Sequence, residues 1–172
     1  MIEIVAAAID QLCVAFERGG YNPTPIIDLG VLVVIADGVV DDKERAVLRD
    51  VFQTLLETKL TPEVVDHLVT ASVQVVEAAG AESRARLIAE ILRDCDAVEP
   101  GILVALAVAY ASDGFSKEER VVIERIADFA EVPRGRLEEL IARVRARADG
   151  DPMSIRTLLS TGAHRPVRVG KS

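Results

Sequence analysis

Acidic side chains gather in two short stretches of this chain, and carboxylates at such close spacing can coordinate a hard cation. They are Asp37, Asp41, Asp42 and Glu44 in the first stretch, and Asp113, Glu118 and Glu119 in the second. In the first stretch four carboxylates lie within eight residues, so their mutual repulsion favours a cation. Ligands that are all oxygen suit Ca²⁺ or Mg²⁺. The two histidines, His67 and His164, join no cysteine cluster, so we do not expect zinc.

Three of these carboxylates, together with Ser116, also fit the pattern of helix caps. Asp41 is followed three residues later by Glu44, and Ser116 by Glu119, which is the spacing of a capping box. In a capping box the two side chains accept hydrogen bonds from backbone N–H groups that the first helical turn leaves unpaired. Each cap stabilises its helix by about 1 kcal/mol, so these residues need no ligand to explain them.

Asp37 and Asp113 have no such simple explanation. Each directly follows an apolar stretch with helical character, so its carboxylate lies where the helix macrodipole is negative. The dipole disfavours a negative charge there by about 0.3–1 kcal/mol. An Asx-turn onto the following N–H groups would offset this cost, and so would a bound cation. Both explanations stay open, but the loop is not an EF-hand, because the D-x-D-x-D-G spacing is absent.

The elements that must position these residues are all predicted to be helices. Apolar residues recur with helical spacing, Thr-Pro or Ser pairs mark helix starts, and glycines mark helix ends. We predict helices over about 2–18, 24–36, 61–80, 82–94, 100–112 and 116–130, with two more beginning at Asp41 and at Pro133. The predicted fold class is therefore all-α, a compact bundle of seven to eight helices.

Two of the predicted helices, 24–36 and 100–112, are apolar on every side, so we expect them to form the buried centre of the bundle. The residues expected to be mostly buried there are Leu32, Val34, Ile35, Val104, Leu106 and Val108. The amphipathic helix that begins at Asp41 should turn one stripe inward, made of Val47, Leu48, Val51, Phe52, Leu55 and Leu56.

An internal repeat links the two acidic stretches. Residues 31–52 match residues 107–127, since each contains an apolar helix, an Asp-Gly turn, a capped N-terminus and an amphipathic helix. The Asp-Gly turns begin at Asp37 and at Asp113, and the second turn is one residue shorter. We therefore predict a bundle built from two pseudo-repeats about a pseudo-two-fold axis, which would bring the acidic turns into comparable positions.

Two stretches resemble a motif of the tellurite-resistance TerB family and of related amino-terminal domains in some J-domain co-chaperones: Ala36–Glu44 and, less fully, Ser112–Glu119. That motif is an Ala-Asp-Gly turn followed by a capped helix beginning with Glu, often present twice. The second stretch departs from it by the shorter turn and by Ser112 in place of Ala. The resemblance covers about residues 1–148. It implies an all-helical fold, divalent-cation binding by acidic residues, a link to tellurite or general stress response, and no catalytic activity.

Composition and charge narrow the classes of function. Half of the residues are hydrophobic, enough for one sizeable core, but only 3% are aromatic, which leaves few platforms for stacking bases. The formal charge of −8 is made of −11 over residues 1–150 and +3 over residues 151–172. Because an acidic body repels nucleic acid, we expect cations or protein partners instead.

The compartment is predicted from what the sequence contains and lacks. Two cysteines without a CxxC motif, Cys13 and Cys95, fit buried free thiols in a reducing cytoplasm. The start of the chain has no basic region typical of a secretory signal. No apolar run approaches the ~20 residues that a transmembrane helix needs, so we expect a cytoplasmic protein without a membrane span.

The leading hypothesis is a cytoplasmic TerB-like module, residues 1–150, that binds a divalent cation through its acidic turns. It would act in tellurite or stress response as a scaffold for protein partners, including partners at the membrane surface. The alternative is a metal-free structural interaction domain whose acidic turns are helix caps. An enzyme is a third class, but no Ser/His/Asp set, Cys/His set or glycine-rich nucleotide loop can be assembled.

Residues 151–172 are predicted to be a mobile basic tail, because they hold few apolar anchors. Truncation after Gly150 should leave the melting temperature, followed by circular dichroism, almost unchanged. A fall of several degrees would instead show that Ile155, Leu158 and Leu159 complete the core.

Overall fold

The computed structural model describes residues 2–22, 24–38, 40, 42, 45, 46, 48, 49, 52, 61–111 and 115–148. Side chains are described for the same residues except 2–6, 37, 62, 111, 147 and 148. Every regular element within these ranges is a helix, and no strand occurs in them, so the all-α prediction is confirmed. The predicted tail, 151–172, lies outside the described residues.

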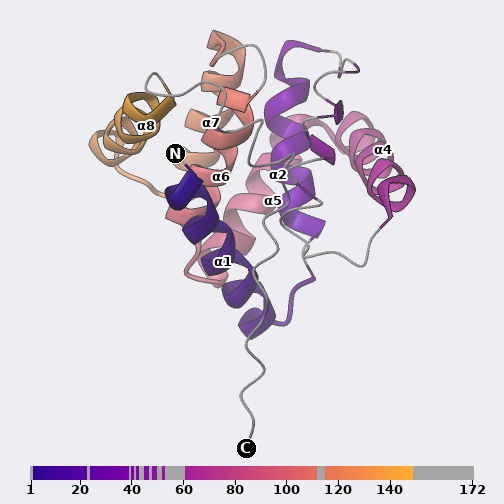
Figure 1. Cartoon of the computed structure of the whole chain (residues 1–172), viewed down its shortest axis with the longest axis horizontal. Coiled ribbons are helices and arrows are strands. Elements are labelled where there is room, and N and C mark those ends of the chain that lie inside the picture. The colour runs from indigo at the N-terminus through magenta and orange to yellow at the C-terminus, as the bar shows by residue number, and fades with distance from the viewer. Residues whose placement is uncertain are drawn as a thin grey trace, which may run out of the picture.

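Seven α-helices and one short 3₁₀ helix follow one another in the described part of the chain. They are α1 (Ile2–Gly19), α2 (Thr24–Val34), η1 (Ile35–Asp37), α4 (Pro62–Ala79), α5 (Ala81–Asp94), α6 (Val98–Ala111), α7 (Lys117–Phe129) and α8 (Arg134–Ala148). Figure 1 shows α4 and α8 on opposite flanks of the bundle, with α2, α5 and α6 between them. Residues 42, 45, 46, 48, 49 and 52 are also helical, in agreement with the helix predicted from Asp41.

α2 and α6 form the centre of the bundle, as their uniformly apolar sequences predict. α2 packs against α4, α5, α6 and α7, and α6 packs against α1, α2, α5, α7 and α8. Every residue of 26–34 and of 101–109 is buried. Burial of each large aliphatic side chain stabilises the fold by about 1.5–3 kcal/mol, so these two helices contribute much of its stability. No described helix has the length and hydropathy to cross a membrane.

The six predicted core residues are all mostly buried. Leu32, Val34, Val104, Leu106 and Val108 are each at most 2% exposed. Ile35 packs against the core but is buried only in part, where α2 gives way to η1.

The predicted helix boundaries differ from the observed ones mainly at α6. This helix begins at Val98, two residues before the predicted start at Pro100. A proline in the first turn of a helix lacks an N–H that would have had no partner within the helix, so the turn can form around it.

Leu48 and Phe52 anchor the partly described segment 42–52 on α2. Both side chains are fully buried, as the inward stripe predicted. A Cβ at Gly30 of α2 would lie 2.9 Å from the Phe52 ring, so the glycine is what allows this close approach. The other members of the stripe, Val47, Val51, Leu55 and Leu56, lie outside the described residues.

The outer helix α8 is held to α6 by paired polar groups. Arg136 donates to both carboxylate oxygens of Glu99, at 2.6 and 2.8 Å, and these hydrogen bonds lower the pKa of Glu99. Arg145 donates to the Tyr110 hydroxyl at 3.3 Å. Two arginines of α8 therefore tie this outer helix to the central helix α6.

Gly101 of α6 tests how tightly the centre is packed. A Cβ there would lie 2.7 Å from both terminal methyl carbons of Leu92, which is itself 1% exposed and has no free volume to enter. Gly101→Ala should lower the free energy of unfolding by about 1–3 kcal/mol, the usual cost of overpacking, despite the better helix propensity of alanine.

Gly135 of α8 is the matched control, since nothing lies within 4 Å of a Cβ there. Gly135→Ala should raise the free energy of unfolding by about 0.4–1 kcal/mol. Urea denaturation of both variants measures the contrast, and a stabilised Gly101→Ala protein would show that the centre relaxes freely.

Candidate functional site

The first acidic stretch begins where the central rod formed by α2 and η1 reaches the surface. η1 ends at Asp37, and Gly38 follows in the left-handed region with a φ of 110°. The Gly38 N–H donates to the Ile35 carbonyl at 2.9 Å. This φ strains any residue with a Cβ, which explains the glycine of the Asp-Gly turn. Asp37 thus lies at the C-terminal end of the apolar rod, as predicted.

Among the other predicted ligands of this stretch, only Asp42 is described. Its backbone is helical and its side chain is exposed. Asp41, Glu44 and the Asp37 side chain lie outside the described residues, and so does the first predicted capping box.

The second acidic stretch contains a complete capping box at the start of α7. Ser116 Oγ accepts a hydrogen bond from the Glu119 N–H at 3.1 Å, and Glu119 Oε2 accepts one from the Ser116 N–H at 2.7 Å. Glu119 is only 6% exposed, whereas Glu118 is open to solvent. The capping role predicted for Ser116 and Glu119 is confirmed, and Asp113 lies outside the described residues.

Tertiary packing brings η1 and the first turns of α7 together, although they lie far apart in the sequence. With the start of α5 they border a pocket of about 360 Å³. Leu32, Ile35 and Ala36 line it from α2 and η1, and Val121, Val122 and Arg125 line it from α7. The segment before the first acidic turn and the segment after the second are therefore neighbours, while the pseudo-two-fold relation of the two halves stays a prediction.

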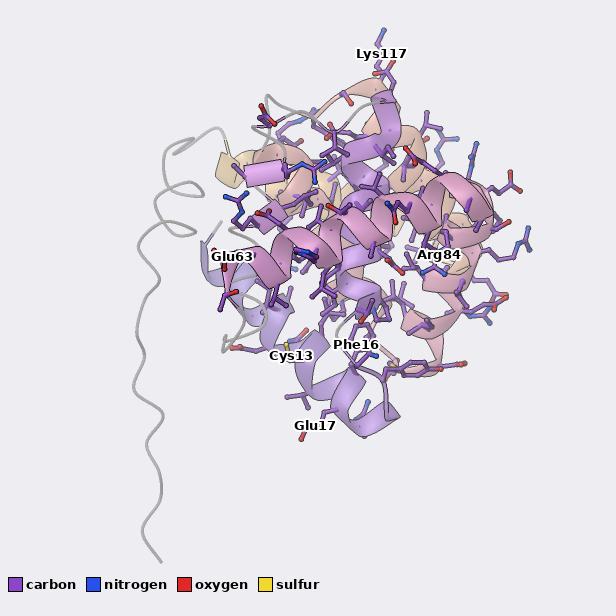
Figure 2. The ribbon with its side chains drawn as sticks, turned by 90° about the vertical axis from the view of Figure 1, so that its right-hand side faces the viewer. Cys13, Phe16, Glu17, Glu63, Arg84 and Lys117 are labelled. Atoms are coloured by element: carbon purple, nitrogen blue, oxygen red, sulfur yellow. The ribbon has the colours of Figure 1, made fainter. Side chains whose placement is uncertain are left out.

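The pocket combines an apolar floor with a charged rim. Val121 is 51% exposed, and Ile35 and Val122 are half-buried. Lys117, Glu118 and Arg125 are exposed at the rim, and Figure 2 shows Lys117 projecting away from the body of the molecule. The ion pairs found among the described residues involve neither of the two cations. Such a surface can hold an apolar group beside an acidic one.

Within the described side chains, no three His, Cys, Asp or Glu residues form a group that could hold a metal ion. This finding does not extend to Asp37, Asp41, Glu44 or Asp113, whose side chains are not among those described. The predicted cation site therefore stays a prediction.

A buried charged cluster in the first half of α2 was missed by the sequence analysis. Asp28 is 4% exposed, and its carboxylate accepts hydrogen bonds from Ser72 of α4 and from Arg84 of α5. One signal pointed to it: Asp28 is the only charged residue of the apolar helix α2. Because a carboxylate is very costly to bury without a partner, its position required a cation or donor from a neighbouring helix.

Three arginines of α5 contact neighbouring segments, although Arg86 and Arg93 are themselves exposed to solvent. Arg84 forms the ion pair with Asp28, and its side chain is only 20% exposed. The Arg86 guanidinium lies 4.4 Å from the centroid of the Phe129 ring, and Arg93 pairs with Glu131 at 3.1 Å. Figure 2 shows Arg84 beside one end of α4. These side chains join α5 to α2 and to the α7 end of the bundle.

Neither Cys13 nor Cys95 is part of a disulfide bond. Cys95 is buried, and burial raises the pKa of its thiol, so the reactive thiolate is disfavoured there. Cys13 is partly buried on α1.

Comparison with protein families matches residues 24–142 to the family described as Tellurite resistance protein TerB. Because the match covers more than half of the chain, the protein belongs to the TerB family, which is a non-catalytic domain family. The matched range begins at α2 and ends within α8, so α1 lies outside it and joins the bundle by packing against α6. Comparisons with curated proteins and with solved structures give no significant match.

Replacing Arg84 should lower the free energy of unfolding more than replacing Asp28 does. Arg84→Met leaves a nearly buried carboxylate with Ser72 alone and should lower the free energy of unfolding by roughly 3–5 kcal/mol. Asp28→Leu should cost less, since the Arg84 side chain keeps 20% exposure and can turn toward water.

The double variant, Asp28→Leu with Arg84→Met, should lie close to the parent, because replacing both partners of a buried pair by apolar groups is often neutral. Urea denaturation of the four proteins gives the coupling between the two residues. If the double variant lost as much free energy of unfolding as the two single variants together, the pairing would be contradicted.

Proposed function

We propose that this protein is a cytoplasmic, non-catalytic TerB module. It binds a divalent cation at its first acidic stretch and acts as an interaction domain for protein partners in tellurite or general stress response. Membership of the TerB family supports the link to tellurite resistance. The observation that carries the cation site is the position of Asp37 at the C-terminal end of the α2–η1 rod.

Four carboxylates lie close together in the sequence around the negative end of the α2–η1 rod. Asp37 lies at the negative end of the rod, and Asp41, Asp42 and Glu44 follow within the next seven residues. Two unit charges 4 Å apart repel by about 1 kcal/mol in water and by about 4 kcal/mol near a protein surface. A divalent cation among these groups would replace such repulsions by attractions, and an all-oxygen ligand set suits Ca²⁺ or Mg²⁺.

The second acidic stretch supports the metal-free alternative better than the first does. The Glu119 carboxylate is buried and closes the capping box, where the positive end of the α7 dipole favours it. We therefore place the principal cation site at the first stretch, and keep Asp113, Glu118 and Glu119 as ligands of a weaker second site.

The cation site can be tested by melting the full chain at low salt with millimolar Ca²⁺, millimolar Mg²⁺ or EDTA. A cation that binds only the folded state must raise the melting temperature by mass action. Asp37→Asn should diminish this rise, because it removes a ligand charge. The same variant should hold or gain stability in EDTA, by up to about 1 kcal/mol, because it removes a charge from the negative helix end.

Asp10→Asn is the matched control, since Asp10 is exposed on α1 and belongs to neither acidic stretch. The Asp10→Asn protein should show the same cation-induced rise in melting temperature as the parent. If Asp37→Asn showed the same rise as well, Asp37 would not be a ligand of the site. The absence of any rise in the parent would reject cation binding and leave the metal-free interaction domain.

A further inference from the structure

We propose that the pocket between η1 and α7 binds an apolar side chain within an acidic, extended peptide segment of a protein partner. This inference deepens the proposed function and rests on it, because it names the surface and the chemistry of the partner. Three observations support it: the apolar floor, the size of the pocket and the placement of two cations beside it.

The apolar floor is open to solvent, unlike the inward apolar residues of α7. Ile123 and Ile126 of the same helix are each 1% exposed, whereas Val121 is 51% exposed. A single exposed valine needs no explanation. Here, however, Val121 borders a pocket to which Ile35 and Val122 add half-buried apolar surface.

The size of the pocket fits part of a peptide. Its volume of about 360 Å³ lies near the lower end of the range of about 300–1,000 Å³ for ligand pockets. Because Val121 and the rim side chains are exposed, the pocket is open to one side. It suits one or two aliphatic side chains that belong to a larger partner.

The placement of charge sets the chemistry of that partner. Lys117, Val121 and Arg125 are spaced four residues apart on α7, so they lie along one face of the helix. The two cations are about 12 Å apart along the axis, at 1.5 Å per residue. An extended peptide covers about 13 Å in four residues and keeps alternate side chains on one face. Acidic residues two positions before and after an apolar one would therefore match Lys117, Val121 and Arg125.

The acidic body of the protein does not prevent this match. At physiological ionic strength the Debye length is about 8 Å, so charges near the pocket dominate. Among the lining residues, Lys117 and Arg125 carry two positive charges and Glu118 carries one negative charge. Asp37 and Glu82 directly follow the lining residues Ala36 and Ala81 in the sequence. A cation bound at the first acidic stretch would offset the charge of Asp37 and so preserve the positive excess of the lining.

The probe is a phage-displayed library of random heptapeptides, selected on the full chain in millimolar CaCl₂ and on the bare support. The enriched peptides should carry Asp or Glu two positions on each side of an aliphatic residue. Synthetic fluorescent copies, measured by anisotropy, should bind Arg125→Glu and Val121→Asp at least about tenfold more weakly than the parent. Both positions are exposed, so the variants should keep the circular dichroism of the parent.

Arg134→Glu is the matched control, because Arg134 is an exposed arginine of α8 that does not line the pocket. It should bind the same peptides as the parent does. The proposal is overturned by no enrichment over the bare support, by enriched peptides without acidic residues, or by peptides that bind Arg125→Glu and the parent alike. A dimer of the parent that Val121→Asp dissolves would assign the pocket to a second copy and would also overturn it.

The melting experiment with Ca²⁺, Mg²⁺ and EDTA shows whether the peptide site or the cation site is the one rejected. A cation-induced rise in melting temperature without peptide binding rejects the peptide site alone. Peptides that bind in EDTA, in a protein that shows no such rise, reject cation binding and support the pocket.

Discussion

The burial of α2 on every side is the constraint on which the rest of the structure depends. The described helices α4, α5, α6 and α7 and the segment 42–52 pack against it, and residues 26–34 are all buried. A charged side chain or a missing side chain in that stretch must therefore be matched by a residue of a neighbouring helix. The Asp28 carboxylate receives Arg84 of α5 and Ser72 of α4, and Gly30 leaves room for the Phe52 ring. One helix thereby determines how three other segments approach it.

A helix buried in this way must return to the surface where it ends, and that exit positions the candidate site. After Val34 the backbone tightens into η1 and emerges against α7, with Gly38 closing the turn. Ile35 is the last large apolar residue of the rod, and it is partly buried against the core. The acidic turn and the pocket are thus adjacent through the end of one helix. A ligand bound in the pocket would contact both η1 and α7.

The carboxylates of the acidic stretches meet opposite ends of helices, since Asp37 ends the α2–η1 rod and Glu119 lies in the first turn of α7. A carboxylate at the N-terminus of α7 is stabilised by the helix dipole and by the free N–H groups, and Glu119 uses both. A carboxylate at the C-terminal end of the α2–η1 rod meets the negative end of the dipole instead. The Glu119 carboxylate is therefore stabilised by its own helix, whereas an Asx-turn or a bound cation would have to offset the dipole at Asp37. This difference makes Asp37 a stronger ligand candidate than Glu119.

The sequence by itself determined what depends on near neighbours in the chain. Helical periodicity predicted the all-α class and the central helices, and the Ser116–Glu119 box was predictable because its partners are three residues apart. Only the tertiary structure decided which distant residues meet. Asp28 and Arg84 are 56 residues apart, and the pocket joins η1 to α7, so no local spacing encodes either. The partial burial of Ile35 was not predictable either, because an apolar residue favours burial but does not show how completely its neighbours cover it.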